Sequence, residues 1–161
     1  MTGERPAGAL PPETLAAIRV VFFEECEAHL AQLTAGLRAL QAGRRDPEAI
    51  GDAARAAHSI KGGAGIFQLN ALARFSGRLE TALGEIRAGR LEPGPDILGL
   101  LSRACEALAD LVAAGAEDRP ADPALTAPIL EQLAAVASEP AAPAGLDFTP
   151  RPMPFQPLRR A

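Results

Sequence analysis

The sequence contains no tryptophan and no tyrosine, and a single lysine, Lys61, stands among sixteen basic residues. Few aromatic and β-branched residues against abundant alanine and leucine favour helices over strands. A net charge of −4 offers no basic field for nucleic acid. No apolar run approaches the ~20 residues of a membrane span, and the N-terminus lacks the apolar core of a signal sequence. We therefore expect an all-α, soluble, cytoplasmic protein that binds neither nucleic acid nor membranes.

Only two cysteines are present, and both fall on apolar helical positions. Cys26 and Cys105 are most simply reduced core residues. A zinc site is the alternative, because Cys26 and His29 share a helix face and His58 with Cys105 would complete a Cys2His2 set. No CxxC or HxxxH spacing supports this set, so the sequence predicts no metal site.

Five segments repeat apolar residues at spacings of three and four, the period of amphipathic helices. The first runs from Pro11-Pro12 to a stop at Gly43, and the second opens at Asp46-Pro47. Asn70 is expected to cap the third, which ends near Gly89, and Asp96 the fourth, which Gly115 and Pro120 close. A shorter fifth segment covers about 122–138, with Pro128 leaving its start open. The inward positions are Leu15, Ile18, Phe22, Cys26, Leu30, Leu33, Leu37 and Leu40; Ala53, Ala57, Ile60, Ala64 and Phe67; Leu72, Phe75, Leu79, Leu83 and Ile86; Leu98, Leu101, Cys105, Leu108 and Val112; and Leu125, Ile129, Leu133 and Val136.

Short connections make consecutive helices antiparallel neighbours, which predicts an up-and-down four-helix bundle with an additional fifth helix. The bundle is expected over residues 12–138, after a flexible N-terminus at 1–11. Residues 139–161 hold six prolines without a period and are predicted to form a disordered linker or tail. Its apolar residues, Phe148, Met153, Phe155 and Leu158, leave a short docking motif as the alternative role.

The run AHSIKGGAGIF, residues 57–67, places a histidine beside the lone lysine and three glycines. Helical spacing puts the following residues on the side away from the buried stripe: Arg55, His58, Lys61, Gly62 and Gly65. His58 is therefore predicted to be exposed. On the third helix, Ala73, Gly77 and Gly84 form a stripe of small residues that only Glu80 interrupts, so Glu80 is the long polar side chain on that seam.

These residue types suit histidine phosphorylation. Imidazole is nucleophilic and largely neutral near pH 7. A carboxylate that accepts a hydrogen bond from one ring nitrogen fixes the tautomer and leaves the other nitrogen free to attack. An ammonium group one helical turn away can meet the phosphoryl oxygens as charge develops. Glycines beside the nucleophile clear space for the active site of a partner.

The segment AAHSIKGGAGIF at 56–67 closely resembles the N-terminal histidine-phosphotransfer (HPt) domain of chemotaxis kinases. Phe22-Phe23-Glu24-Glu25 and Gly77-Arg78-Leu79-Glu80 are similar to that family too, and the resemblance covers about residues 12–138. It implies that His58 is the phosphoacceptor, that Glu80 orients its imidazole, and that Lys61 stabilises phosphoryl charge. It also implies a partner surface around them, for which we name Arg55, Ser59, Gly62, Gly63 and Gly65. Gln68 departs from the family, which often has glycine there.

The resemblance implies two partners: the ATP-binding domain of a histidine kinase and the receiver domains of response regulators. No Walker-type loop, GxGxxG turn or carboxylate cluster for magnesium appears, so ATP and Mg²⁺ are expected on partner domains and no cofactor in this chain. The alternative is a helical module that docks or sequesters such domains without being phosphorylated. His29, at the edge of the first apolar stripe, is expected to be a packing residue. Whether the chain stands alone or belongs to a longer kinase is left open.

Overall fold

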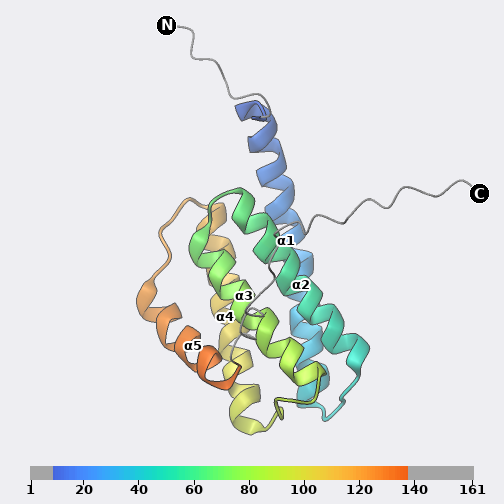
Figure 1. Cartoon of the computed structure of the whole chain (residues 1–161). Helices are drawn as coiled ribbons and strands as arrows, with labels where there is room; N and C mark the ends of the chain where they lie inside the picture. Colours follow the sequence, from blue (N-terminus) through green and yellow to red (C-terminus); the bar gives the residue numbers. More distant parts are fainter. Residues whose placement is uncertain (1–8, 138–161) are drawn as a thin grey trace, which may run out of the picture.

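The computed structural model describes residues 9–137 and forms an all-α bundle, as predicted (Figure 1). Within these residues there are five helices: α1 (Pro12–Gln41), α2 (Pro47–Ile66), α3 (Asn70–Arg87), α4 (Pro95–Ala116) and α5 (Pro123–Val136). The N-terminal residues 1–8 and the proline-rich segment predicted at 139–161 lie outside the described residues. None of the described helices is both long and apolar enough to cross a bilayer.

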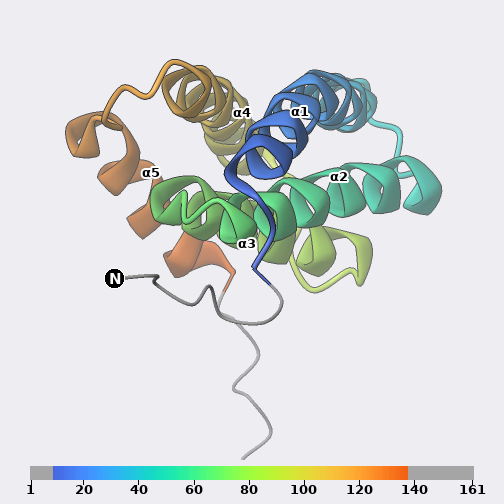
Figure 2. The ribbon, with the colours of Figure 1, turned by 90° about the horizontal axis from the view of Figure 1, so that it is seen from above.

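The first four helices form two layers around one core, seen from above in Figure 2. α1 and α4 make one layer, α2 and α3 make the other, and α5 packs against α3 and α4. The core contains side chains from all five helices. Phe75 is its largest fully buried side chain, and Leu33, Ile60, Leu108 and Leu133 are fully buried as well.

The helix starts show which capping signals operate. Proline occupies the first positions of α1, α2, α4 and α5, where its missing N–H costs nothing. Asp46 and Asp122 cap α2 and α5 by accepting a hydrogen bond from the backbone two residues on. The predicted caps at Asn70 and Asp96 are wrong. α3 begins at Asn70 after Leu69, and α4 begins at Pro95 after Gly94, so both polar residues already lie inside the helix.

Four of the helices end in the same turn, in which a residue with positive φ closes two backbone hydrogen bonds onto the last helical carbonyls. Gly43 and Gly89 take this position after α1 and α3, both at φ 77°. Gln68 and Asp118 take it after α2 and α4, at φ 57° and 53°. The glycine that the family often has at position 68 therefore matches a left-handed conformation that glutamine adopts here at a cost.

Three residues predicted to face the core are exposed instead. Leu15 and Ile18 lie on the first turns of α1, which project beyond the bundle (Figure 1). Gly63 of α2 faces Phe22 of α1, so α2, which ends three residues later at Ile66, stops level with about Arg19. The first two turns of α1, roughly 10 Å, therefore extend past the end of α2. Leu125, on the first turn of α5, is 59% exposed.

Two glycines allow α1 and α2 to pack closely. A Cβ atom on Gly36 of α1 would lie 2.7 Å from Cβ of Ala53 on α2. A Cβ atom on Gly63 of α2 would lie 2.3 Å from the ring of Phe22 on α1. Neither glycine can accept a side chain without moving its neighbour.

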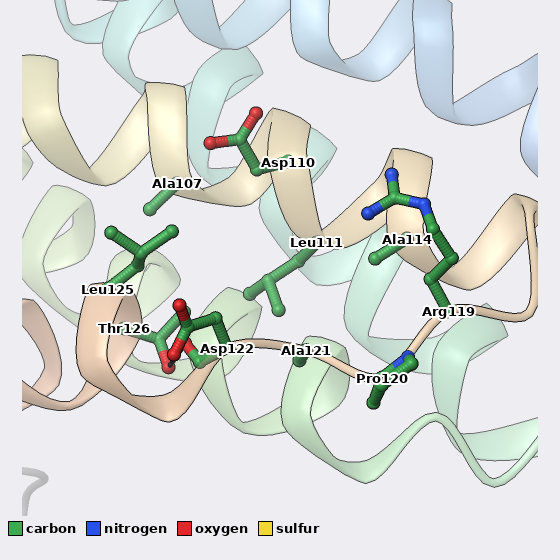
Figure 3. A pocket seen from close by; sticks show the side chains of 10 residues that line it. All are labelled: Ala107, Asp110, Leu111, Ala114, Arg119, Pro120, Ala121, Asp122, Leu125 and Thr126. Carbon is green, nitrogen blue, oxygen red and sulfur yellow. Dashed lines mark hydrogen bonds between the residues drawn. The ribbon is translucent and has the colours of Figure 1, made fainter.

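A small pocket of about 180 Å³ lies between α4 and the connection into α5 (Figure 3). Leu111 and Ala114 line its floor, and Asp110, Arg119 and Asp122 stand around its mouth. Arg119 pairs with Glu117, and Asp122 caps α5. These groups therefore serve the helix connection.

Candidate functional site

The predicted site residues come together where α2 and α3 run antiparallel. Three facing pairs fix the register of the two helices: Gly51 with Arg87, His58 with Glu80, and Lys61 with Gly77. The capped start of α2 and its buried stripe of alanines and Ile60 hold the helix against the core. His58 consequently points away from the core.

His58 is exposed and hydrogen-bonded at one ring nitrogen only. Its side chain is 68% exposed, which confirms the prediction that it faces solvent. Nδ1 lies 2.8 Å from Oε1 of Glu80, whose side chain is 28% exposed. An ionised carboxylate only accepts hydrogen bonds, so Nδ1 carries the proton and donates it. The lone pair of the neutral ring is then on Nε2, which is available to a partner.

Lys61 lies on the next turn of α2 and reaches the same carboxylate. Its Nζ donates to Oε2 of Glu80 over 3.4 Å, and the side chain is 49% exposed. The aliphatic part of Lys61 crosses α3 at Gly77, where an added Cβ would lie 3.4 Å from Cδ. Glu80 thus connects the imidazole of His58 and the ammonium group of Lys61.

The glycines near His58 differ in what surrounds them. Gly62 and Gly65 are exposed, and an added Cβ on either would meet nothing within 4 Å. Gly63 faces Phe22, so the structure gives its missing side chain an internal packing role. Arg55 and Ser59 are also exposed, and Arg55 pairs with Asp52.

Sequence reasoning did not single out the apolar side chains beside this surface. Ile66 is 66% exposed and follows Gly62 by one turn on the same face of α2. Val21 is 50% exposed and precedes Phe22, which contacts Gly63 across the seam between α1 and α2. The sequence could have predicted the exposure of Ile66, because this apolar residue lies off the buried stripe of α2.

The cysteines lie apart from this chemistry. Cys26 is fully buried and Cys105 is half-buried against the core. Burial raises the pKa of Cys26 to about 12 and that of Cys105 to about 11. Within residues 9–137, no three histidine, cysteine or acidic side chains lie together as a metal site would require. His29 is half-buried, and its Nδ1 lies 3.4 Å from Gln32 Oε1.

An exposed imidazole with one nitrogen fixed by a carboxylate and an ammonium group alongside can form and stabilise an N-phosphoryl bond. The helical bundle and this arrangement of His58, Glu80 and Lys61 define a class of helical domains that present an exposed histidine bound to a carboxylate. The model of the Hpt domain family matches residues 17–139, so the chain belongs to the Hpt domain family.

The curated relatives are chemotaxis proteins. The chain is 40% identical over 137 residues to the chemotaxis protein CheA of Rhizobium meliloti, an alignment that covers 85% of this chain. It is 41% identical over 128 residues to CheA of Cereibacter sphaeroides, covering 76% of this chain. In both cases it spans only 18% of the relative's length.

A solved structure shares the fold. The phosphorylated P1 domain of CheA3 in complex with CheY6 from R. sphaeroides superposes with a TM-score of 0.62 at 23% identity. The match covers 73% of this chain and 96% of that one.

Proposed function

We propose that this domain carries phosphoryl groups in chemotaxis-type two-component signalling, with His58 as the acceptor. One observation carries the proposal: Nδ1 of an exposed imidazole is held 2.8 Å from a carboxylate, so Nε2 is the free nucleophile. Membership of the Hpt family and the identity with CheA proteins support it. Because the phosphoryl source is ATP, the proposal places the domain in the cytoplasm.

The first transfer takes the phosphoryl group from ATP and Mg²⁺ bound to the ATP-binding domain of a histidine kinase. Nε2 of His58 attacks the γ-phosphorus, the bond to the bridging oxygen breaks, and ADP leaves with that electron pair. The ring gains positive charge as the N–P bond forms. Glu80, hydrogen-bonded to Nδ1–H, stabilises that charge, and Lys61 can turn from Glu80 to the phosphoryl oxygens.

The second transfer passes the group to the aspartate of a receiver domain. The aspartate oxygen attacks phosphorus, the P–N bond breaks, and its electron pair returns to Nε2. We infer that the receiver docks on the exposed face of α2, where Gly62 and Gly65 offer open backbone and Ile66 and Val21 offer apolar contacts. The complex of the related P1 domain with CheY6 supports this kind of partner.

Labelling with a chemotaxis-type kinase domain and radioactive ATP tests the proposal. The wild-type chain and His29→Gln should gain an acid-labile, base-stable phosphoryl group, and His58→Gln should gain none. Labelling of His58→Gln at the wild-type level would contradict the assignment. A chain that binds the kinase but is never labelled would instead be the interaction-only module.

A further inference from the structure

A groove runs between α1 and α4, in the layer that does not carry His58, and only residues of these two helices line it. Figure 2 shows the two helices side by side. It consists of an upper hollow of about 440 Å³ and a lower hollow of about 330 Å³, and Ala109 lines both. We call the two hollows together the α1–α4 groove. The proposed phosphotransfer steps use none of its residues.

The groove has an apolar floor and acidic edges. Phe23, Leu30 and Val112 line the upper hollow, and α4 contributes only alanine to its outer wall, at 109, 113 and 116. Three carboxylates stand along the edges: Glu24, Glu27 and Glu106.

Two arginines also line the α1–α4 groove. Arg19 donates to Asp118 at 2.7 Å and to the carbonyl of Gly115 at 2.6 Å, so its charge is already matched. Arg38 lines the lower hollow. Because Asp118 balances the charge of Arg19, the charges that remain in the groove are Arg38 and the three carboxylates. The groove is therefore net negative and favours an apolar segment that carries positive charge.

The chain itself contains such a segment. Residues 148–160 include Phe148, Met153, Phe155 and Leu158, and carry three arginines and no acidic residue. Ten residues separate this segment from Ala137, enough to span up to ~36 Å when extended. Arg103 of α4 donates to Gln132 of α5 at 2.9 Å, which places the end of α5 level with the first turns of α4. The lower end of the groove, at Gln41 and Ser102, lies at the same level on the α1 side of α4, so the ten residues would pass around α4 to reach it.

The spacing of apolar residues matches as well. Four prolines between 150 and 157 favour an extended polyproline helix, in which residues three apart lie on one face about 9 Å from each other. Phe155 and Leu158 have that separation. On α1, Phe23 and Leu30 are two turns apart, about 10.5 Å. One face of such a helix could therefore contact both.

We propose that residues 148–160 bind the α1–α4 groove of the same chain, with Phe155 and Leu158 on its apolar floor and the arginines facing Glu24, Glu27 and Glu106.

A single tryptophan tests this proposal, because the chain has none. In Phe155→Trp, fluorescence emission should be shifted to shorter wavelength and quenched less by acrylamide than that of a free peptide of residues 148–160 with the same substitution. Adding Ala113→Gln, which fills the groove from an exposed position, should return both readings to those of the peptide. Ala135→Gln, an exposed alanine of α5 outside the groove, is the matched control and should leave them shifted.

Three results would overturn the proposal. Emission equal to that of the free peptide would mean that the segment does not bind. A shift that survives Ala113→Gln would place the segment elsewhere, and a shift that grows with protein concentration would mean that it binds a second copy. Helix content and unfolding midpoint of each variant, measured by circular dichroism, establish that the bundle is intact. The readout does not depend on phosphorylation, so it stands apart from the test of His58.

Discussion

Gly62 and Gly63 are adjacent in sequence, yet the same substitution should have opposite effects on them. Gly62→Ala places a methyl group in open space on a helix, where alanine is more stable than glycine by about 0.5–1 kcal/mol. Gly63→Ala gains the same helix preference but puts Cβ 2.3 and 2.4 Å from two ring carbons of Phe22.

The ring of Phe22 has little room to move. Its centroid lies 5.0 Å from that of Phe23 and 5.5 Å from that of Phe67, and the side chain is 8% exposed. Overpacking of this kind costs about 1–3 kcal/mol, more than the helix preference returns. We therefore expect Gly62→Ala to raise the free energy of unfolding and Gly63→Ala to lower it, with a gap of about 2 kcal/mol between the variants.

Urea denaturation followed by circular dichroism measures both changes, and equal m-values would show that the unfolding transition is comparable. Phe22→Leu removes the ring and should recover part of the loss when combined with Gly63→Ala. If Gly63→Ala were as stable as Gly62→Ala, the close contact between α1 and α2 at Gly63 would be refuted.

Three further predictions follow from the turn after α2, the site and the buried thiols. Gln68→Gly should raise the free energy of unfolding by about 0.5–1 kcal/mol in urea melts, because glycine adopts φ 57° without strain; no gain would contradict the left-handed turn. Glu80→Ala and Lys61→Ala should keep the folded circular dichroism spectrum yet slow labelling by roughly tenfold to a thousandfold, and wild-type rates in both would make these side chains ordinary surface residues. At pH 8 the raised pKa values keep Cys26 and Cys105 neutral: ~0.1% or less of each is thiolate, against about a quarter of a free thiol. Iodoacetamide should therefore alkylate both cysteines slowly in the native protein and readily in urea. Rapid alkylation of the native chain would contradict the burial of Cys26 and the shielding of Cys105.

The site was predictable because it depends on helical periodicity. Once the buried stripe of α2 is known, the direction of His58 follows, and the small residues of α3 leave Glu80 as the polar partner on the seam. That Glu80 Oε1 meets Nδ1, and that Oε2 meets Lys61, depends on the register of α2 against α3, which no local pattern contains.

Sequence reasoning falls short where a neighbouring helix decides the outcome. Leu15 and Ile18 continue the apolar period of α1, but α2 ends before it can cover them. Gly63 lies between the exposed and buried faces of α2. Only the position of the Phe22 ring on α1 shows that the missing side chain makes room for packing between the two helices. Asn70 has the side chain of a cap, yet the turn at Gln68 leads directly into α3 and leaves it no extended position to occupy.

The central claim is that His58 is phosphorylated at the nitrogen that Glu80 leaves free. Nuclear magnetic resonance on protein labelled with ¹⁵N-histidine and phosphorylated by the kinase domain tests it directly, because coupling to phosphorus identifies the modified nitrogen. The account predicts coupling to Nε2 of His58, with the proton retained on Nδ1 facing Glu80. Phosphorus on Nδ1 of His58, or on His29, would contradict it.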